Sequence, residues 1–276
     1  MNQNSKFALT LFSTNPTLIR RAVAAGVEGI IVDWEYLGKE DRQACADTQI
    51  NHDTLDDLRK VRLCTTTTVI CRINCFGATT ELEVEQAIQA GADEILLPMV
   101  ETADEVQRVL DLVRGRAGVG VLIETIAALG IVDEIARLPL SQVYVGLNDL
   151  AIARKEPNIF VALVDGTVEQ IRSQVSLPFG FGGLTLPDRG YPIPCRLLIG
   201  EMARLNCDFS FLRRSFTRDI QDREVSVEVH RILEAMTQAR TRSLEAIDRD
   251  RYDLELAIQR FDPQLLIDPK DELREQ

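Results

Sequence analysis

Two carboxylates close neighbouring apolar runs of the chain. Glu124 lies near the end of GVGVLIET (118–125), and Asp149 lies at the end of QVYVGLND (142–149). If these runs are adjacent parallel strands, both carboxylates reach one edge of the sheet, where they repel each other unless a cation neutralises them. Oxygen ligands that leave positions open suit Mg²⁺ or Mn²⁺, so the pair predicts a metal site. The alternative is that each acid caps the helix after its strand.

An arginine and two further acids stand at other strand ends. Arg72 follows the apolar run TVIC, and Asp33 and Glu35 end the run GIIVDWE (29–35). A guanidinium beside a bound metal can hold a substrate carboxylate or enolate oxygen through paired hydrogen bonds. We therefore predict a substrate-binding and catalytic role for Arg72. Alternatively, Arg72 forms an ion pair with Asp33 or Glu35 within the rim, and the two roles are compatible.

These residues need a scaffold, which the hydrophobic pattern describes. Short β-rich runs alternate with amphipathic helical patterns along most of the chain. Several runs are continuously apolar, as strands buried on both faces of a parallel sheet must be. The predicted strands cover residues 7–14, 29–35, 68–74, 94–100, 118–125, 142–149, 177–184 and 209–216.

The helical patterns between the strands repeat one design. Residues 17–26, 80–91 and 103–115 each carry an apolar stripe and end on a glycine, a common helix C-cap. Eight such β–α units predict a (β/α)8 barrel, or TIM barrel, whose active site lies at the C-terminal ends of the strands. An open doubly wound sheet is the alternative, but no GxGxxG motif follows the first strand.

The last part of the chain has a different composition. Residues 219–261 are heavily charged with a helical pattern throughout, and the tail after them contains Pro263 and Pro269. We therefore divide the chain into a barrel domain at 1–220 and a charged helical C-terminal extension at 221–276. The amphipathic pattern favours packing against the barrel and contacts with a neighbouring subunit, and the alternative is that this region covers the mouth of the pocket.

The overall composition limits the class of protein and partner. The chain has 276 residues, of which 45% are hydrophobic and 27% charged, as in a globular protein. Its net charge of −12 disfavours nucleic acid and an anionic membrane surface as partners, although a pocket could still bind an anion. Six scattered cysteines without a CxxC pair predict reduced thiols. Since neither a signal peptide nor a membrane-spanning run is visible, we expect a cytoplasmic location.

Two other features near the predicted rim could contact an anion. Residues 178–196 form a glycine-containing loop whose amides could approach an anionic group, or whose glycines simply allow tight turns. Arg213 and Arg214, at the end of the eighth predicted strand, could meet a phosphate of CoA or bridge to acids of the C-terminal helix.

Five fragments in order resemble one enzyme family. They are GVEGIIVDWE, CRIN, GADEILLPMVET, VLIET and VYVGLNDLA. Over about residues 5–220 the chain resembles the metal-dependent lyases and aldolases that include the citrate lyase β-subunit, malyl-CoA lyases and 2-keto-3-deoxy sugar acid aldolases. The resemblance implies a barrel that assembles into trimers or hexamers, often with a C-terminal segment reaching a neighbour.

The same resemblance implies roles for individual residues. Glu124 and Asp149 would bind Mg²⁺ or Mn²⁺, and Arg72 would contact the carbonyl and carboxylate of the substrate. Three consecutive residues would line the oxyacid pocket with their amides: Gly146, Leu147 and Asn148.

The implied chemistry is cleavage or formation of a carbon–carbon bond in a small oxyacid or its CoA thioester. A retro-aldol step produces an enolate, whose oxygen the metal and Arg72 would stabilise. A base must take a proton from the substrate hydroxyl. Asp33 and Glu35 are candidates for this base, beside a metal-bound water and His52.

The chain also departs from its relatives. Sugar acid aldolases usually carry a histidine directly after the acids of the second strand, where this chain has Tyr36, and a glutamine where it has Leu122. The CoA-ester branch carries basic residues slightly later, which Lys39 and Arg42 match in outline, so an acyl-CoA substrate is favoured. The alternatives are a thioester hydrolase or decarboxylase using the same site, and a non-catalytic metabolite-binding or scaffold protein.

Overall fold

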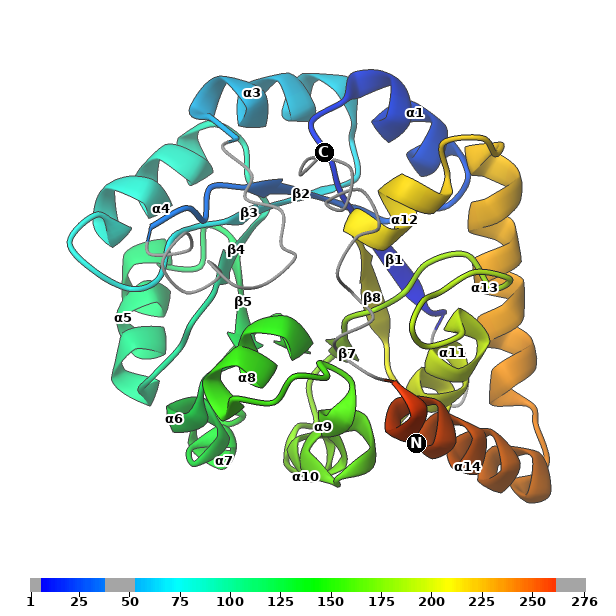
Figure 1. The fold of residues 1–276 in the computed structure, drawn as a ribbon. Coiled ribbons are helices and arrows are strands. Elements are labelled where there is room, and N and C mark those ends of the chain that lie inside the picture. The colour runs from blue at the N-terminus through cyan, green and yellow to red at the C-terminus, as the bar shows by residue number, and fades with distance from the viewer. Residues whose placement is uncertain (1–5, 38–52, 262–276) are drawn as a thin grey trace, which may run out of the picture.

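Eight parallel strands form the centre of the protein, whose computed structural model describes residues 6–37 and 53–261. Hydrogen bonds connect them in the order β7-β6-β5-β4-β3-β2-β1-β8. At the remaining seam the amide of Asp208 donates to the carbonyl oxygen of Phe179 at 2.8 Å. The strands therefore form a nearly closed barrel (Figure 1), which confirms the predicted (β/α)8 TIM barrel over the open sheet.

Every predicted strand is present, but each ends two to four residues earlier than predicted. The polar residues after each apolar run leave the sheet and turn toward the next helix, so they are not part of the ladder. The strands are β1 (Ala8–Phe12), β2 (Gly29–Asp33), β3 (Thr68–Arg72), β4 (Glu94–Leu97), β5 (Gly118–Ile123), β6 (Gln142–Val145), β7 (Phe179–Phe181) and β8 (Phe209–Leu212).

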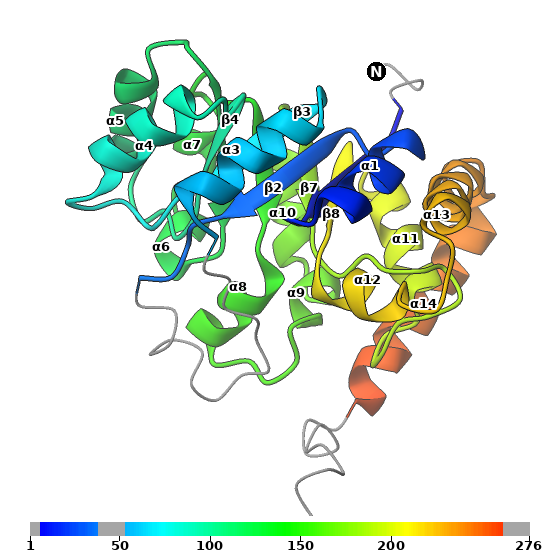
Figure 2. The ribbon, with the colours of Figure 1, turned by 90° about the horizontal axis from the view of Figure 1, so that it is seen from above.

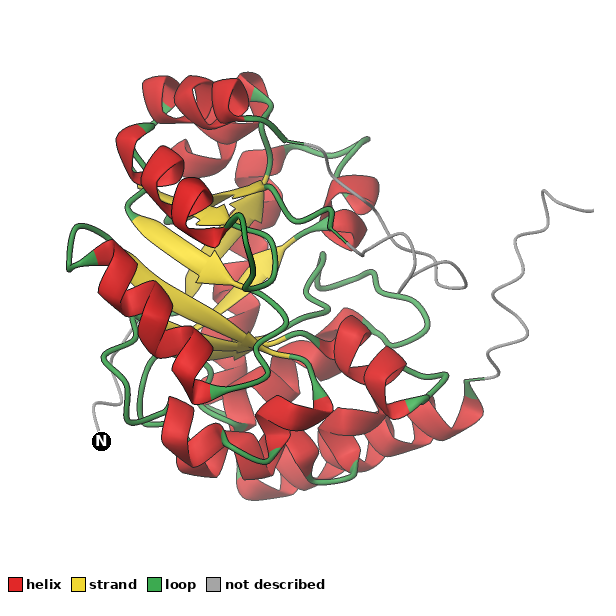
Figure 3. Cartoon of the chain, turned by 90° about the vertical axis from the view of Figure 1, so that its left-hand side faces the viewer, coloured by secondary structure: helices red, strands yellow, loops and turns green. Residues whose placement is uncertain are grey.

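Helices surround the barrel on all sides (Figures 1 and 3). In the first part of the chain they are α1 (Pro16–Ala24), α3 (Leu55–Cys64), α4 (Thr80–Gln89), α5 (Ala103–Val113), α6 (Ile126–Leu129), α7 (Val132–Ile135) and α8 (Leu147–Arg154). The later ones are α9 (Val161–Val164), α10 (Thr167–Gln174), α11 (Cys195–Arg204), α12 (Arg214–Asp219), α13 (Val225–Arg240) and α14 (Leu244–Arg260). None of these described helices is long and apolar enough to cross a membrane.

Two apolar clusters hold the barrel together. The larger one fills the space between the sheet and the helices. The smaller one fills the barrel interior with side chains from seven strands, as in other packed (β/α)8 barrels. Its buried members are Phe12, Ile31, Ile70, Leu96, Leu122, Tyr144, Phe209 and Phe211.

The C-terminal region is not one continuous helix as the pattern predicted. The chain leaves the helical conformation between α12 and α13 and again between α13 and α14, where Ser243 caps α14. Figure 2 shows α13 beside α11, and α13 also packs against α1. It therefore takes the place of the helix after the eighth strand, with Val229, Ile232 and Met236 in the common core.

The last helix, α14, lies outside α11 and α9. Nδ2 of the Asn158 side chain donates to the carbonyl oxygen of Ile258 at 3.2 Å, and the Arg242 guanidinium donates to the carbonyl oxygen of Gly200 at 2.8 Å. The five cysteines in the described residues are not joined in disulfides.

Candidate active site

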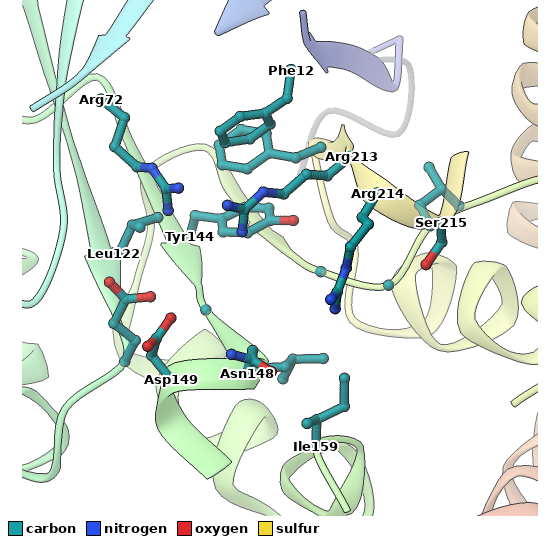
Figure 4. Close-up of a pocket in the computed structure, with 17 residues that line it drawn as sticks. Phe12, Arg72, Leu122, Tyr144, Asn148, Asp149, Ile159, Arg213, Arg214 and Ser215 are labelled. Atoms are coloured by element: carbon teal, nitrogen blue, oxygen red, sulfur yellow. The ribbon is translucent and has the colours of Figure 1, made fainter. Parts of the chain in front are cut away.

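One pocket opens where several strands end, on the side at which (β/α)8 enzymes place their active sites (Figure 4). Phe12, Leu122 and Tyr144 contribute apolar surface to it, and charged side chains surround them. Six of the eight predicted site residues line this pocket: Arg72, Glu124, Gly146, Leu147, Asn148 and Asp149. The other two, Asp33 and Glu35, are fully buried and contact Arg72.

Arg72 is held from two directions by carboxylates. Its Nε donates to Oδ1 of Asp33 at 2.8 Å, and its Nη2 donates to Oδ2 of the same residue at 2.7 Å. Its Nη1 lies 2.9 Å from Oε2 of Glu35. The ion pair considered as an alternative role is therefore present, while the guanidinium still lines the pocket.

These contacts fix both the charge and the direction of the guanidinium. Burial by itself lowers the pKa of Arg72, but the carboxylates of Asp33 and Glu35 raise it above the usual value. A bidentate ion pair also restricts rotation of the arginine, so its donors are oriented before any ligand arrives. The guanidinium is thus a fixed positive charge in the pocket wall.

Glu124 and Asp149 interact across the same pocket. Oε1 of Glu124 accepts a hydrogen bond from the amide of Met99 at 3.0 Å. Burial, followed by the negative charges of Asp149 and Glu35, raises the pKa of Glu124 to about 8. Figure 4 shows the carboxylate of Asp149 directed into the pocket. A cation placed between the two carboxylates would remove this unfavourable interaction.

The donor set suits a hard divalent cation. The described residues contain no cluster of three or more histidine, cysteine or acidic side chains that could hold a metal. A cation bound in the pocket would meet the Glu124 and Asp149 carboxylates and leave its remaining positions to substrate and water. Carboxylate oxygens with several open positions are typical of Mg²⁺ and Mn²⁺ sites.

The segment after β6 differs from the prediction in its local structure. Asn148 and Asp149 do not end a strand, because β6 stops at Val145 and α8 begins at Leu147. Asp149 lies in the first turn of this helix, where a carboxylate also interacts favourably with the helix dipole. At this position Asp149 could therefore act both as a metal ligand and as an acid near the N-terminus of α8.

The structure explains why position 146 is a glycine, and the explanation was not predicted from sequence. A Cβ at this position would overlap Oε2 of Glu124 and would lie 3.0 Å from the Cβ and the carboxyl carbon of that residue. The glycine therefore makes room for the Glu124 carboxylate, in addition to lining the pocket beside Leu147 and Asn148.

The floor of the pocket consists of aromatic rings that the sequence did not predict as site residues. The ring of Tyr144 stacks on that of Phe211 with centroids 3.8 Å apart, and Phe12 meets Phe211 edge-on at 5.7 Å. From the sequence, Tyr144 was only part of the predicted strand 142–149. The alternation of side chains along a strand could have identified it, because Tyr144 and Leu122 each stand two residues before a predicted site residue.

Arg213 contacts residues of the first two strands of the barrel. Its Nη2 lies 3.5 Å from Oδ2 of Asp33, and its guanidinium lies 4.9 Å from the centre of the Phe12 ring. Arg213 and Arg214 both line the pocket. Asp33 thus contacts two arginines, Arg72 and Arg213.

One further acid lies near this network. The amide of Asp33 donates to Oδ2 of Asp53 at 2.9 Å. Burial, together with the charge of Asp33, raises the pKa of Asp53 to about 6. The adjacent His52, a candidate base from the sequence, lies outside the described residues, as do Lys39 and Arg42.

The family is identified by comparison with known proteins. A sequence model of the HpcH/HpaI aldolase/citrate lyase family matches residues 6–158, which is more than half of the chain. The chain belongs to this family. The match covers Arg72, Glu124 and Asp149 and confirms the predicted resemblance.

Solved structures support the fold of this HpcH/HpaI family member. Citrate synthase SbnG shares 16% sequence identity, covering 80% of this chain and 90% of that chain with a TM-score of 0.58. An HpcH/HpaI aldolase/citrate lyase family protein from Burkholderia cenocepacia J2315 shares 14% identity, covering 87% and 96% with a TM-score of 0.59. No curated protein matches the chain. At these low sequence identities, the two solved structures support only the shared barrel fold.

Proposed function

We propose that this aldolase/citrate lyase family member is a Mg²⁺- or Mn²⁺-dependent carbon–carbon lyase that acts on a small oxyacid or its CoA thioester. One observation carries the proposal: a fixed guanidinium and a pair of interacting carboxylates line the same pocket, in a chain that belongs to a lyase family. The three groups are Arg72, Glu124 and Asp149.

The two carboxylates would hold the cation. Bound there, Mg²⁺ or Mn²⁺ would act as a Lewis acid on a substrate carbonyl. Gly146 keeps the space beside Glu124 open, and the amide of Met99 orients that carboxylate. The chain's own contribution at this end of the pocket is therefore a preformed pair of oxygen ligands.

Arg72 would stabilise the negative charge that develops on the substrate. In a retro-aldol step the hydroxyl gives its proton to a base, the carbon–carbon bond breaks, and its electron pair forms an enolate. The other fragment leaves as an aldehyde or ketone, and the enolate carbon then takes up a proton. Since Asp33 and Glu35 already orient the guanidinium, little reorganisation is needed when the enolate oxygen forms.

The geometry favours positioning roles for Asp33 and Glu35. Both oxygens of Asp33 contact Arg72, and Oε2 of Glu35 contacts the same guanidinium. A carboxylate engaged in this way is a weaker proton acceptor than one that faces the substrate. We therefore assign both acids to holding Arg72 in place. Of the two roles considered from sequence, the ion pair with Arg72 is favoured over that of the catalytic base.

The experiment that tests the function identifies the products. The protein is incubated with Mg²⁺ and a panel of hydroxy-oxoacids and 3-hydroxyacyl-CoA thioesters, and products are followed by NMR. Two carbon fragments support a lyase. Free CoA with an intact acid indicates a hydrolase, whereas carbon dioxide with a shortened acid indicates a decarboxylase. Either of these outcomes would contradict the proposal.

Variants connect the reaction to the pocket. Arg72→Lys and Glu124→Gln should each lower kcat/KM by about 100-fold or more, because the first removes the oriented guanidinium near the developing enolate and the second removes a proposed carboxylate ligand of the metal. Arg196→Lys is the control, since that arginine is 58% exposed and pairs with Asp250 away from the pocket. Full activity in both pocket variants would contradict the assignment.

A further inference from the structure

One aliphatic side chain of the pocket wall differs from the others in its exposure. Among the described residues, four aliphatic side chains line the pocket: Leu122, Leu147, Ile159 and Leu184. The three leucines are buried, whereas Ile159 is only partly buried against the large apolar cluster. Figure 4 shows Ile159 on the side of the pocket opposite Phe12. The apolar part of a ligand that extends in this direction therefore meets Ile159.

The backbone around Ile159 is held by the residue before it. Residues 155–160 connect α8 to α9, so Ile159 does not belong to a helix or a strand. Oδ1 of Asn158 accepts a hydrogen bond from the amide of Phe160 at 3.0 Å, which closes a turn around Ile159. The carbonyl oxygen of Asn158 accepts from the amide of Val161 at 3.2 Å. The position of Ile159 thus depends on Asn158.

The residue after Ile159 is fixed by packing. The side chain of Phe160 is buried, and a Cβ added to Gly183 would lie 3.0 Å from Cε1 of its ring. Gly183 lines the same pocket as Ile159. A shift of the 158–160 segment would therefore change two parts of the pocket wall.

The C-terminal helix contacts this segment through Asn158. Asn158 is buried, and its Nδ2 donates to the carbonyl oxygen of Ile258 at 3.2 Å. Ile258 lies in the last turn of α14, where backbone carbonyl groups lack the amide four residues further along a helix. The amide of Phe261 donates to the same oxygen at 3.3 Å. One side chain therefore joins α14 to the turn that holds Ile159.

Helix α14 is itself anchored to two other helices. Nη1 of Arg251 lies 2.9 Å from Oε1 of Glu201, a buried residue of α11, and Nη2 lies 3.7 Å from Oε2 of Glu169 in α10. Leu254 and Ile258 add buried apolar surface. The carbonyl oxygen of Ile258 is thus a positioned acceptor for the Asn158 side chain.

We propose that α14 takes part in substrate selection through Asn158, a positioning residue that holds Ile159 in the pocket wall. Ile159 is then the specificity-determining residue, and it limits the length of the carbon chain that the pocket accepts. The inference rests on the proposed function in taking a small oxyacid as the ligand, whose carboxylate would meet Arg72. It adds that the apolar end of this acid contacts Ile159.

The experiment measures the binding of 2-oxoacids of increasing chain length. Pyruvate, 2-oxobutyrate, 2-oxopentanoate, 2-oxohexanoate and 2-oxoheptanoate are titrated by calorimetry at one fixed Mg²⁺ concentration. The affinity of the wild type should fall about tenfold or more at the first acid that is too long for the pocket, because overpacking is costly. We call this fall the length step.

A variant of Ile159 tests which side chain causes the length step. In Ile159→Ala the step should move to an acid longer by one or more carbons, and each methylene group newly buried should raise the affinity about fourfold. Val161→Ala is the matched control, because it shortens an aliphatic side chain of the adjoining helix that does not line the pocket.

Two variants of Asn158 separate its contacts. Asn158→Asp keeps the acceptor for the Phe160 amide and loses the donor to α14, whereas Asn158→Ala loses both. Each should reduce the length step to about threefold or less. Leu163→Ala is the control, because it truncates a buried side chain of α9 outside the pocket. If Asn158 had only a structural role, its variants would lower the unfolding midpoint and leave the step unchanged.

Several results would overturn the inference. They are the absence of binding or of a length step in the wild type, an unmoved step in Ile159→Ala, and an unchanged step in Asn158→Asp, which lacks only the contact with α14. None of them decides the lyase function, which depends on the products formed. Conversely, failure to detect carbon–carbon cleavage would not alter a length step that is measured by binding.

Discussion

Gly146 and Glu124 show how one residue depends on another that is distant in sequence. The glycine directly follows β6, and the Glu124 carboxylate lies in the space that a side chain at this position would fill. Neither residue explains the other from sequence alone, because the contact exists only when β5 and β6 are adjacent. The position of the proposed metal ligand is therefore set by packing as well as by its own chemistry.

Substitution of this glycine tests that dependence. Gly146→Ala should displace the Glu124 carboxylate, lower the free energy of unfolding by about 1–3 kcal/mol and weaken Mg²⁺ binding, since overpacking forces a local shift. Urea unfolding and calorimetry measure the two effects. Gly77→Ala is the control, because its added Cβ would lie 3.9 Å from the nearest atom, the carbonyl oxygen of Cys75. Unchanged Mg²⁺ affinity in Gly146→Ala would contradict this account of Glu124.

Asp53 gives the protein a pH-dependent contribution to stability. Its pKa is raised from 3.8 to about 6, so between these values the folded state holds a proton that the unfolded state releases. The contribution is fully present below about pH 4 and is lost as the pH rises through 6. The stability advantage of wild type over Asp53→Asn should therefore shrink between pH 4 and pH 7.

Urea unfolding at several pH values measures this difference. Asp56→Asn serves as the control, because Asp56 is an exposed acid of α3 that pairs with Arg59 on the same helix. A constant difference between wild type and Asp53→Asn across the whole pH range would contradict the raised pKa.

At the level of elements, the ends of β2 and β3 are joined by Asn74. Its backbone amide and its Nδ2 each donate to the Glu83 carboxylate at 2.9 Å, and its Oδ1 accepts from the amides of Tyr36 and Leu37 at 3.0 and 2.9 Å. The turn after Glu35 is thereby fixed to β3 and to α4. These contacts support the position of the acids that orient Arg72.

Helix α13 takes the place of the helix after the eighth strand and buries one of its faces against the barrel. Ile232 of α13 is fully buried, whereas Val227 of the same helix is 53% exposed. Ile232→Ala should lower the free energy of unfolding by about 2–5 kcal/mol through lost burial and a residual cavity. Val227→Ala, the matched control, should change it by less than about 0.5 kcal/mol. A separate unfolding transition for α13 in urea would show instead that this helix is not part of the barrel's cooperative unit.

At the scale of the whole molecule, metal binding should raise the thermal stability. A ligand that binds only the native state at 100 times its Kd adds about 2.7 kcal/mol, which shifts the unfolding midpoint upward. Mg²⁺ should produce this shift in wild type but not in Glu124→Gln. Glu101→Gln is the control, because it removes an exposed carboxylate from the same end of the barrel.

The control also accounts for general effects of a divalent cation on a chain of net charge −12. An equal Mg²⁺ shift in wild type and in Glu124→Gln would indicate non-specific binding and would contradict the proposed metal site. The trimeric or hexameric assembly, and the division at residues 220 and 221, stay predictions that sedimentation analysis and limited proteolysis can test.

The sequence by itself determined the architecture, because hydrophobic periodicity and glycine-terminated helical patterns are local properties. Short β-rich runs, several of them continuously apolar, predicted the strands. Arg72, Glu124 and Asp149 were chosen as site residues because the C-terminal ends of parallel strands meet at one rim. The strand ends were predicted too late, since an apolar pattern does not show where the backbone leaves the ladder. Asp149 moved from a strand end to the first turn of α8 for this reason.

Only the tertiary structure decided which side chains meet. The contact of Arg213 with Asp33 joins residues 180 positions apart, and the role of Tyr144 in the pocket floor depends on its stacking with Phe211 from a strand on the other side of β7. The place of α13 in the barrel depends on the surfaces of α1 and α11 that it covers. Contacts of this kind arise from chain closure in three dimensions, which no local pattern of residues specifies.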